Sequence, residues 1–182
     1  MTVNPFVIDT ELRREPGNSR RIDTTVTLDE RLGTDVIGIP AGGALHLDLL
    51  LESVMDGILV SGTVSGELEG ECVRCLRPLT KDLEVEVTEL YAYPDTLEEG
   101  EADDEEEEPV PTVEEDTIDL TGLIVDAVVP DLPFSPLCRE DCEGLCPQCG
   151  TDLAENPGHA HEAPIDPRWA ALSKLARDDN DE

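Results

Sequence analysis

The sequence predicts an α+β fold, with an antiparallel β-sheet or partly open barrel and two short helices. Apolar and polar residues alternate through most of residues 1–94, which is the period of a half-buried β-strand. After residue 116 the pattern changes to a helical segment, a loop rich in Cys, Pro and Gly, and a second helical segment. A chain of 182 residues is long enough for one domain with a real core.

The strands follow from the alternation and its interruptions. In residues 44–54 every odd position from Leu45 to Leu51 is leucine, so these four leucines are expected on one buried face. Asp56-Gly57 is a hairpin signal, which makes residues 58–70 the antiparallel partner strand. Glycine recurs every fourth residue at the end of that strand and favours a bent or bulged conformation. Further strands are predicted at residues 23–28, 36–39 and 83–93.

Two helices are predicted in the C-terminal third. Residues 117–128 form the first, capped by Thr117 or Asp119 and stopped by Pro130. The second begins at Asp166, which suits an N-cap because proline follows it at the first helical position. We expect this second helix to dock on the body through one apolar face, formed by Trp169, Leu172 and Leu175.

Charge divides the chain and limits its partners. The formal net charge is −32. Residues 95–116 hold 13 acidic residues and no Lys or Arg, so we predict a disordered acidic insert between a β-rich body (residues 1–94) and a C-terminal part (residues 117–182). Such a surface disfavours extensive contact with nucleic acid and attracts basic proteins.

Four arginines near the N-terminus are the exception to this charge pattern. They fall within nine residues and are weak candidates for contacts with RNA or with another partner. The alternative is an exposed turn whose charges offset nearby acids. The four residues are Arg13, Arg14, Arg20 and Arg21.

The start of the chain shows no basic segment followed by an apolar run, as a secretory signal would. No apolar stretch approaches the 18 residues or so of a membrane span. We therefore expect a cytoplasmic protein without membrane contact. Thiols stay reduced in that compartment, so paired cysteines are interpreted as metal ligands before disulfides.

Cysteine and histidine supply eight candidate zinc ligands. Cys72 and Cys75 form a Cys-x-x-Cys pair between two predicted strands, where a turn can aim both sulfurs at one ion. The other six ligands lie in the C-terminal loop and predict a zinc-stabilised C-terminal segment: Cys138, Cys142, Cys146, Cys149, His159 and His161. Because tetrahedral zinc takes four ligands, the count suggests one or two ions. A redox dithiol and buried cysteines without metal are the alternatives.

Spacing alone does not fix how the ligands group. In the favoured grouping one zinc joins Cys72 and Cys75 to Cys138 and Cys142, and a second binds the remaining four ligands. In the rival grouping the four C-terminal cysteines share one zinc. The spacing Cys-x3-Cys-x2-Cys from residue 142 also occurs in iron–sulfur enzymes built on a large barrel of alternating strands and helices, but this chain lacks their length and alternation.

The flanking residues resemble a known family. Gly70-Glu71-Cys72-Val73-Arg74-Cys75-Leu76, then Cys142-Glu143-Gly144-Leu145-Cys146-Pro147-Gln148-Cys149-Gly150, then Asp166-Pro167-Arg168-Trp169 are similar to the YceD family of large ribosomal RNA subunit accumulation proteins. The resemblance covers almost the whole chain. Relatives often carry cysteines where this chain has His159 and His161, and imidazole can replace thiolate on zinc.

The resemblance implies a non-enzymatic factor in large ribosomal subunit biogenesis, which supports accumulation or processing of the large-subunit ribosomal RNA. Its partners would be that RNA, a basic ribosomal protein, or both. The sequence contains no phosphate-binding glycine loop and no nucleophile motif, so no enzyme activity and no small-molecule substrate are expected. The alternative function is a cytosolic thiol redox or metal-relay protein that uses the Cys pairs.

Overall fold

The computed structural model describes residues 4–96 and 110–161. Contacts divide the chain into two compact units, Met1–Cys142 and Glu143–Glu182. The first unit contains every named strand and helix of the described residues. They are β1 (Val7–Asp9), β2 (Ser19–Thr27), β3 (Leu32–Gly33), β4 (Ile37–Ile39), β5 (Ala44–Ser53), β6 (Gly57–Glu71), β7 (Pro78–Ala92), β8 (Thr117–Asp119) and α1 (Thr121–Asp131).

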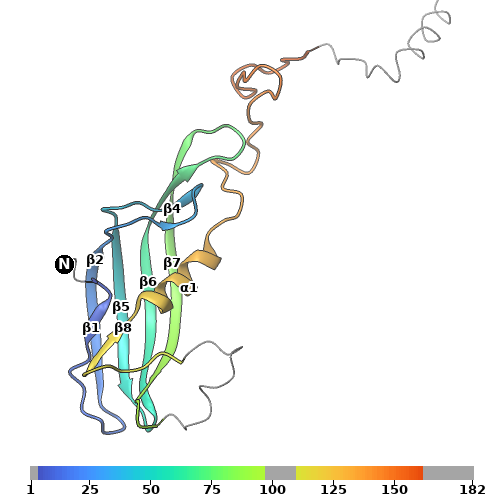
Figure 1. Ribbon diagram of the computed structural model, residues 1–182. Helices are drawn as coiled ribbons and strands as arrows, with labels where there is room; N and C mark the ends of the chain where they lie inside the picture. Colours follow the sequence, from blue (N-terminus) through green and yellow to red (C-terminus); the bar gives the residue numbers. More distant parts are fainter. Residues whose placement is uncertain (1–3, 97–109, 162–182) are drawn as a thin grey trace, which may run out of the picture. The chain divides into compact units, whose positions relative to one another are not determined.

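Strand β6 is the centre of an antiparallel six-stranded sheet that forms a half-barrel (Figure 1). Strand β7 pairs with β6 along its whole length, from Gly57 opposite Ala92 to Glu71 opposite Pro78. The other edge of β6 is shared, because β5 pairs with its first part and β4 with its end. On their outer edges β5 pairs with β2 and β4 pairs with β3. Strands β1 and β8 form a separate two-stranded sheet. The predicted antiparallel sheet or partly open barrel is confirmed in this form.

Alternate residues of the long strands build the core. The leucines at odd positions from Leu45 to Leu51 are at most 1% exposed, as the alternation predicted. Across the sheet Leu47 and Leu51 lie opposite Val64 and Val60 of β6, whereas Leu45 and Leu49 lie opposite two of its glycines. The two valines in turn lie opposite residues of β7. Helix α1 contacts β7 and contributes Ile124 and Val128 to the same core.

The predicted helix begins later than expected. Residues Thr117–Asp119 form strand β8, which pairs with β1, and α1 starts only at Thr121. Neither Thr117 nor Asp119 is the N-cap residue, although the Asp119 carboxylate accepts a hydrogen bond from the Thr121 N–H (2.8 Å). Pro130 does not stop the helix, since it lies within the last turn.

The glycines of β6 do not mark a bulge. Its register with β5 and β7 runs without interruption. Gly62 has a φ of 152°, and a Cβ at this position would collide with the Asp48 carbonyl oxygen of β5. The glycine is therefore required by the close approach of two paired backbones.

Two predicted features lie outside the described residues. They are the central part of the acidic insert (97–109) and the second helix from Asp166. The described residues contain one α-helix, α1. Among the described helices, none is long and apolar enough to cross a membrane.

Replacing Gly62 with alanine is expected to lower the free energy of unfolding by about 2 kcal/mol or more, because the new methyl group meets backbone that cannot move independently. Gly122→Ala in α1 is the matched control. Nothing lies within 4 Å of its Cβ position, so the same change should raise the free energy by up to about 1 kcal/mol. Urea denaturation of both variants measures the difference, and equal effects would contradict the close-approach explanation.

Candidate metal centres

Four cysteines from two distant segments meet at one end of the half-barrel. Cys72 and Cys75 lie in the turn between β6 and β7, and Cys138 and Cys142 lie in the loop that follows α1. All four sulfurs are within 4.8 Å of one another. The Cys72 and Cys142 sulfurs are 3.8 Å apart, and those of Cys75 and Cys138 are 3.6 Å apart.

Backbone contacts hold the two segments together around this cluster. The Val73 N–H donates a hydrogen bond to the Pro136 carbonyl (3.0 Å). From the same turn the Arg74 guanidinium donates to the Cys142 carbonyl (2.8 Å). Three of the four cysteines are buried, with only Cys138 exposed, so the site is largely closed to solvent.

A second cluster lies in the second unit. The side chains of Cys146, Cys149, His159 and His161 bring their ligand atoms within 4.8 Å of one another. The Cys149 sulfur is 3.2 Å from the Nε2 atom of each histidine, and the two Nε2 atoms are 2.9 Å apart. Only Cys146 is buried, which leaves this site more open than the first.

The distances fit tetrahedral zinc at the first cluster. Zn–S bonds of about 2.3 Å place two sulfurs of a tetrahedron about 3.8 Å apart, which matches the 3.8 and 3.6 Å between the paired sulfurs. With Zn–N bonds of about 2.1 Å the second cluster would need about 3.6 Å between sulfur and nitrogen and about 3.4 Å between nitrogens. Its atoms are a few tenths of an ångström closer, so a small expansion admits the ion.

This arrangement corresponds to the grouping that the sequence favoured. Cys138 and Cys142 lie with Cys72 and Cys75, whereas Cys146 and Cys149 lie with the two histidines. The rival set of four C-terminal cysteines is not assembled, and the iron–sulfur triad from residue 142 is divided between the two clusters. All six cysteines are among the described residues, and none forms a disulfide.

The two Cys-x-x-Cys loops share one backbone geometry. In the first, the Cys72 N–H donates to the Arg77 carbonyl and the Leu76 N–H donates to the Cys72 carbonyl. In the second, the Cys146 N–H donates to the Thr151 carbonyl and the Gly150 N–H donates to the Cys146 carbonyl. We call the two loops, residues 72–77 and 146–151, knuckle 1 and knuckle 2.

Both knuckles need a left-handed residue directly after the second cysteine. Knuckle 2 has Gly150 there, with a φ of 73°, whereas knuckle 1 has Leu76, with a φ of 57°. The side chain of Leu76 is 60% exposed. Sequence reasoning missed this position, although aligning the two Cys-x-x-Cys motifs would have placed the leucine opposite a glycine.

The sulfurs within each cluster differ in how readily they lose a proton. Burial raises the pKa of the Cys72 thiol, but hydrogen bonds from the backbone at Cys138, Cys75 and Arg74 outweigh this effect and lower it to about 6. Burial, followed by hydrogen bonds among the thiols, raises the pKa of Cys138 to about 12. Cys72 is thus the sulfur that offers a thiolate near neutral pH, which is the form that binds a metal ion.

In the second cluster Cys149 is the easily ionised sulfur. Hydrogen bonds from the Thr151 hydroxyl and backbone, and then from His161, lower the pKa of its thiol to about 6. The hydroxyl lies 3.1 Å from the sulfur. A thiolate that is already formed near neutral pH is the form that binds a metal ion.

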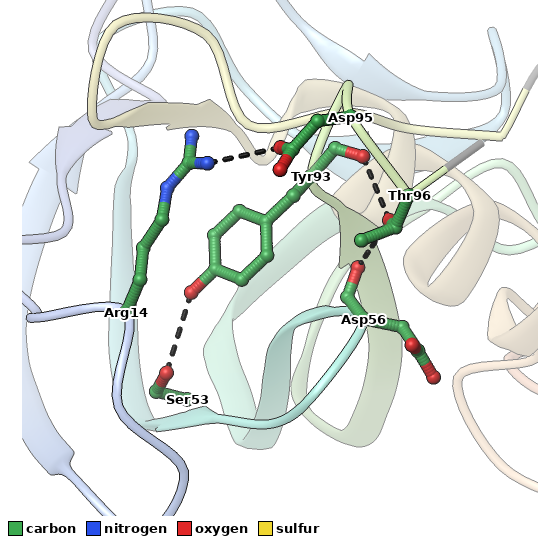
Figure 2. Close-up of polar contacts among 6 residues, drawn as sticks. All are labelled: Arg14, Ser53, Asp56, Tyr93, Asp95 and Thr96. Atoms are coloured by element: carbon green, nitrogen blue, oxygen red, sulfur yellow. Dashed lines mark hydrogen bonds and ion pairs between the residues drawn. The ribbon is translucent and has the colours of Figure 1, made fainter.

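Three of the four N-terminal arginines are engaged within the protein. Arg14 pairs with Asp95 (2.9 Å) and stacks on the ring of Tyr93 (Figure 2). Arg20 pairs with an acidic side chain of the preceding loop, Glu11 (3.1 Å). Arg21 forms two hydrogen bonds with the Asp48 carboxylate and holds the pKa of that group below its ordinary value. The side chain of Arg13 makes no hydrogen bond or ion pair with another residue of the described ranges. The four residues therefore do not form a cluster of unpaired charge.

Leu76→Gly is expected to raise the free energy of unfolding by about 0.5–1 kcal/mol. The change relieves left-handed strain of about 1–2 kcal/mol and adds chain entropy to the unfolded state that offsets about half of it. Leu76→Ala is the control, because it removes the exposed side chain but keeps the strain. Chemical denaturation should show a gain for glycine alone, and a gain for both variants would mean that strain is not the cause.

Comparison with known proteins gives the same family as the residues around the cysteines suggested. The family model of the large ribosomal RNA subunit accumulation protein YceD matches residues 60–176. An uncharacterized protein of Mycobacterium tuberculosis is 48% identical over 98% of this chain and 84% of its own length. An uncharacterized protein of Mycobacterium leprae is 42% identical over 97% of this chain and 80% of its own length. The uncharacterized protein YlbN of Bacillus subtilis is 30% identical over 94% of this chain and 96% of its own length. No solved structure was found to match the chain. The chain therefore belongs to the YceD family of large ribosomal RNA subunit accumulation proteins.

Proposed function

We propose that this protein is a zinc-stabilised, non-enzymatic factor of the cytoplasm that supports large-subunit ribosomal RNA accumulation by binding a basic ribosomal protein. The family description supplies the link to the large subunit. The observation that supports a basic protein as partner is the acidic outer face of the sheet.

This outer face is defined by the residues that alternate with the core positions of β5, β6 and β7. Cross-strand rows on it run from Asp48 through Thr63 to Glu86, and from His46 through Ser65 to Glu84. Further carboxylates on the same face come from Asp23, Glu52 and Glu67. Small hydroxyl side chains occupy its centre, so a long cationic side chain has room to reach the carboxylates on either side.

The arginine contacts favour protein over extended RNA as the partner of this face. Arg21, the arginine on the outer face, is already paired with Asp48. Binding of phosphates requires cations that can replace the counterions of the nucleic acid, and the outer face offers few. A basic protein is instead attracted by the same field that repels RNA.

Zinc has a structural role in this proposal. One ion at Cys72, Cys75, Cys138 and Cys142 would fix knuckle 1 to the loop after α1, and a second at Cys146, Cys149, His159 and His161 would order knuckle 2. Zinc in such closed four-ligand sites contributes directly to folding. The matched sulfur distances of the first cluster support metal binding over the alternative of a redox dithiol or metal relay.

Metal analysis of the purified chain is expected to give two zinc ions. A Cys146→Ser/Cys149→Ser double variant should retain one ion and leave the unfolding of the β-sheet unchanged, because its ligands belong to the other unit. Cys75→Ser/Cys142→Ser should also lose one ion, but should lower the unfolding midpoint. Inductively coupled plasma mass spectrometry and circular dichroism measure the two effects. Reversible oxidation of Cys72 and Cys75 to a disulfide, with no bound zinc, would favour the redox alternative.

Affinity capture from growing cells is expected to recover a basic large-subunit protein. Glu84→Gln/Glu86→Gln should weaken this capture several-fold, since it removes two charges from the outer face without changing side-chain size. Asp29→Asn/Glu30→Gln is the matched control and alters two exposed acids in the loop after β2. Quantitative mass spectrometry of the captured material measures the change. Recovery of ribosomal RNA with no ribosomal protein would overturn the proposal.

A further inference from the structure

Knuckle 1 carries features that its metal ligands do not need. Leu76 occupies a left-handed position that glycine fills in knuckle 2, yet its side chain is 60% exposed. A strained residue whose side chain packs on little within the protein points to a contact outside it.

Two other exposed apolar side chains lie in knuckle 1 or in the segment that is hydrogen-bonded to it. Val73, within the Cys-x-x-Cys motif, is 44% exposed, and Phe134 is 99% exposed. Phe134 comes two residues before Pro136, whose carbonyl accepts the Val73 N–H. The hydrogen bond between Val73 and Pro136 brings the segment of Phe134 next to the turn that carries Val73 and Leu76. We call these three exposed side chains the apolar patch.

The turn beside this patch is basic, in contrast to most of the molecule, because residues 72–81 hold three Lys or Arg residues and no acidic residue. Four of the nine Lys and Arg residues in the described ranges lie in or near knuckle 1. Arg74 and Arg139 contact the Cys142 carbonyl and the Asp141 carboxylate, and both contacts leave further N–H donors on the guanidinium groups. The full basic set is Arg74, Arg77, Lys81 and Arg139.

We propose that knuckle 1 binds single-stranded RNA, with unpaired bases on the apolar patch and phosphates at the neighbouring basic side chains. An exposed aromatic ring gives a stacking platform that accepts any base, and cations beside it can bind the backbone. Single-stranded RNA is recognised in this way, because its bases can be splayed out of a helix. The acidic outer face of the sheet would then remain available to the protein partner.

This inference rests on the proposed function for the origin of its RNA, but it uses a different surface. The outer-face variant Glu84→Gln/Glu86→Gln lies on β7, whereas the patch lies on the turn before it and on the loop after α1. Loss of RNA binding and loss of protein capture can therefore be measured separately.

The test uses the full purified chain and a fluorescein-labelled single-stranded RNA of mixed sequence, about 12 nucleotides long, with a duplex of equal length for comparison. Fluorescence anisotropy is expected to show binding of the single strand in preference to the duplex. Phe134→Ala should weaken binding about tenfold. Leu76→Gly should also weaken it, although that variant is expected to be the more stable protein. Met55→Ala, which alters an 80% exposed side chain in the turn between β5 and β6, should have no effect.

Two further measurements identify the ligand. Lys81→Ala should lower the slope of log K against log salt by about 0.7, the value for one phosphate contact on a single strand. A photoreactive phenylalanine analogue at position 134 should crosslink to ribosomal RNA in growing cells. Crosslinks to protein alone would assign the patch to a peptide and overturn the proposal, as would equal binding by Phe134→Ala and the unaltered protein. If RNA binding depends on the patch but no basic protein is captured, the proposed function fails and this inference stands.

Discussion

The long β6–β7 hairpin is the element on which the rest of the structure depends. Its fifteen paired positions run in one register from Gly57 and Ala92 to Glu71 and Pro78. A shift by one residue would turn the valines and leucines of both strands from the core to solvent, so the hydrophobic pattern fixes the register. The same register fixes the turn, and the turn carries Cys72 and Cys75. Metal-ligand geometry at the end of the hairpin is thus set by packing along its length.

Prediction from sequence succeeded where many residues repeat one signal. The alternation of leucines in β5 extends over ten residues and outweighs any local ambiguity. It failed at Thr117–Asp119, because a three-residue strand is formed by its pairing with β1 and carries too few residues for a period. The grouping of ligands was foreseen only as one of two possibilities. Spacing along the chain does not reveal that the loop after α1 returns to the hairpin turn, and the Val73–Pro136 hydrogen bond is a tertiary contact.

Net charge alone is a poor guide to the partners of this protein. The value of −32 describes the whole chain. Among the described residues, however, the basic ones are concentrated at two places and differ there in their contacts. Near the N-terminus, Arg14, Arg20 and Arg21 are paired with carboxylates of the same chain. Around knuckle 1 the guanidinium of Arg74 instead contacts a backbone carbonyl. A carbonyl orients the guanidinium without cancelling its charge, so Arg74 keeps a charge that the paired N-terminal arginines do not.

The two knuckles show how one loop geometry serves different environments. Their backbone hydrogen bonds are equivalent, but three of the four cysteines at the first cluster are buried, whereas the second cluster has one buried ligand. A cation bound at the first cluster would neutralise thiolates that solvent barely reaches, so its removal would uncover charge in a largely buried site. A cation bound at the more open second cluster could be lost to water at a smaller cost. A metal bound at the first site would therefore be coupled to the stability of the sheet, whereas one bound at the second could exchange without disturbing the hairpin.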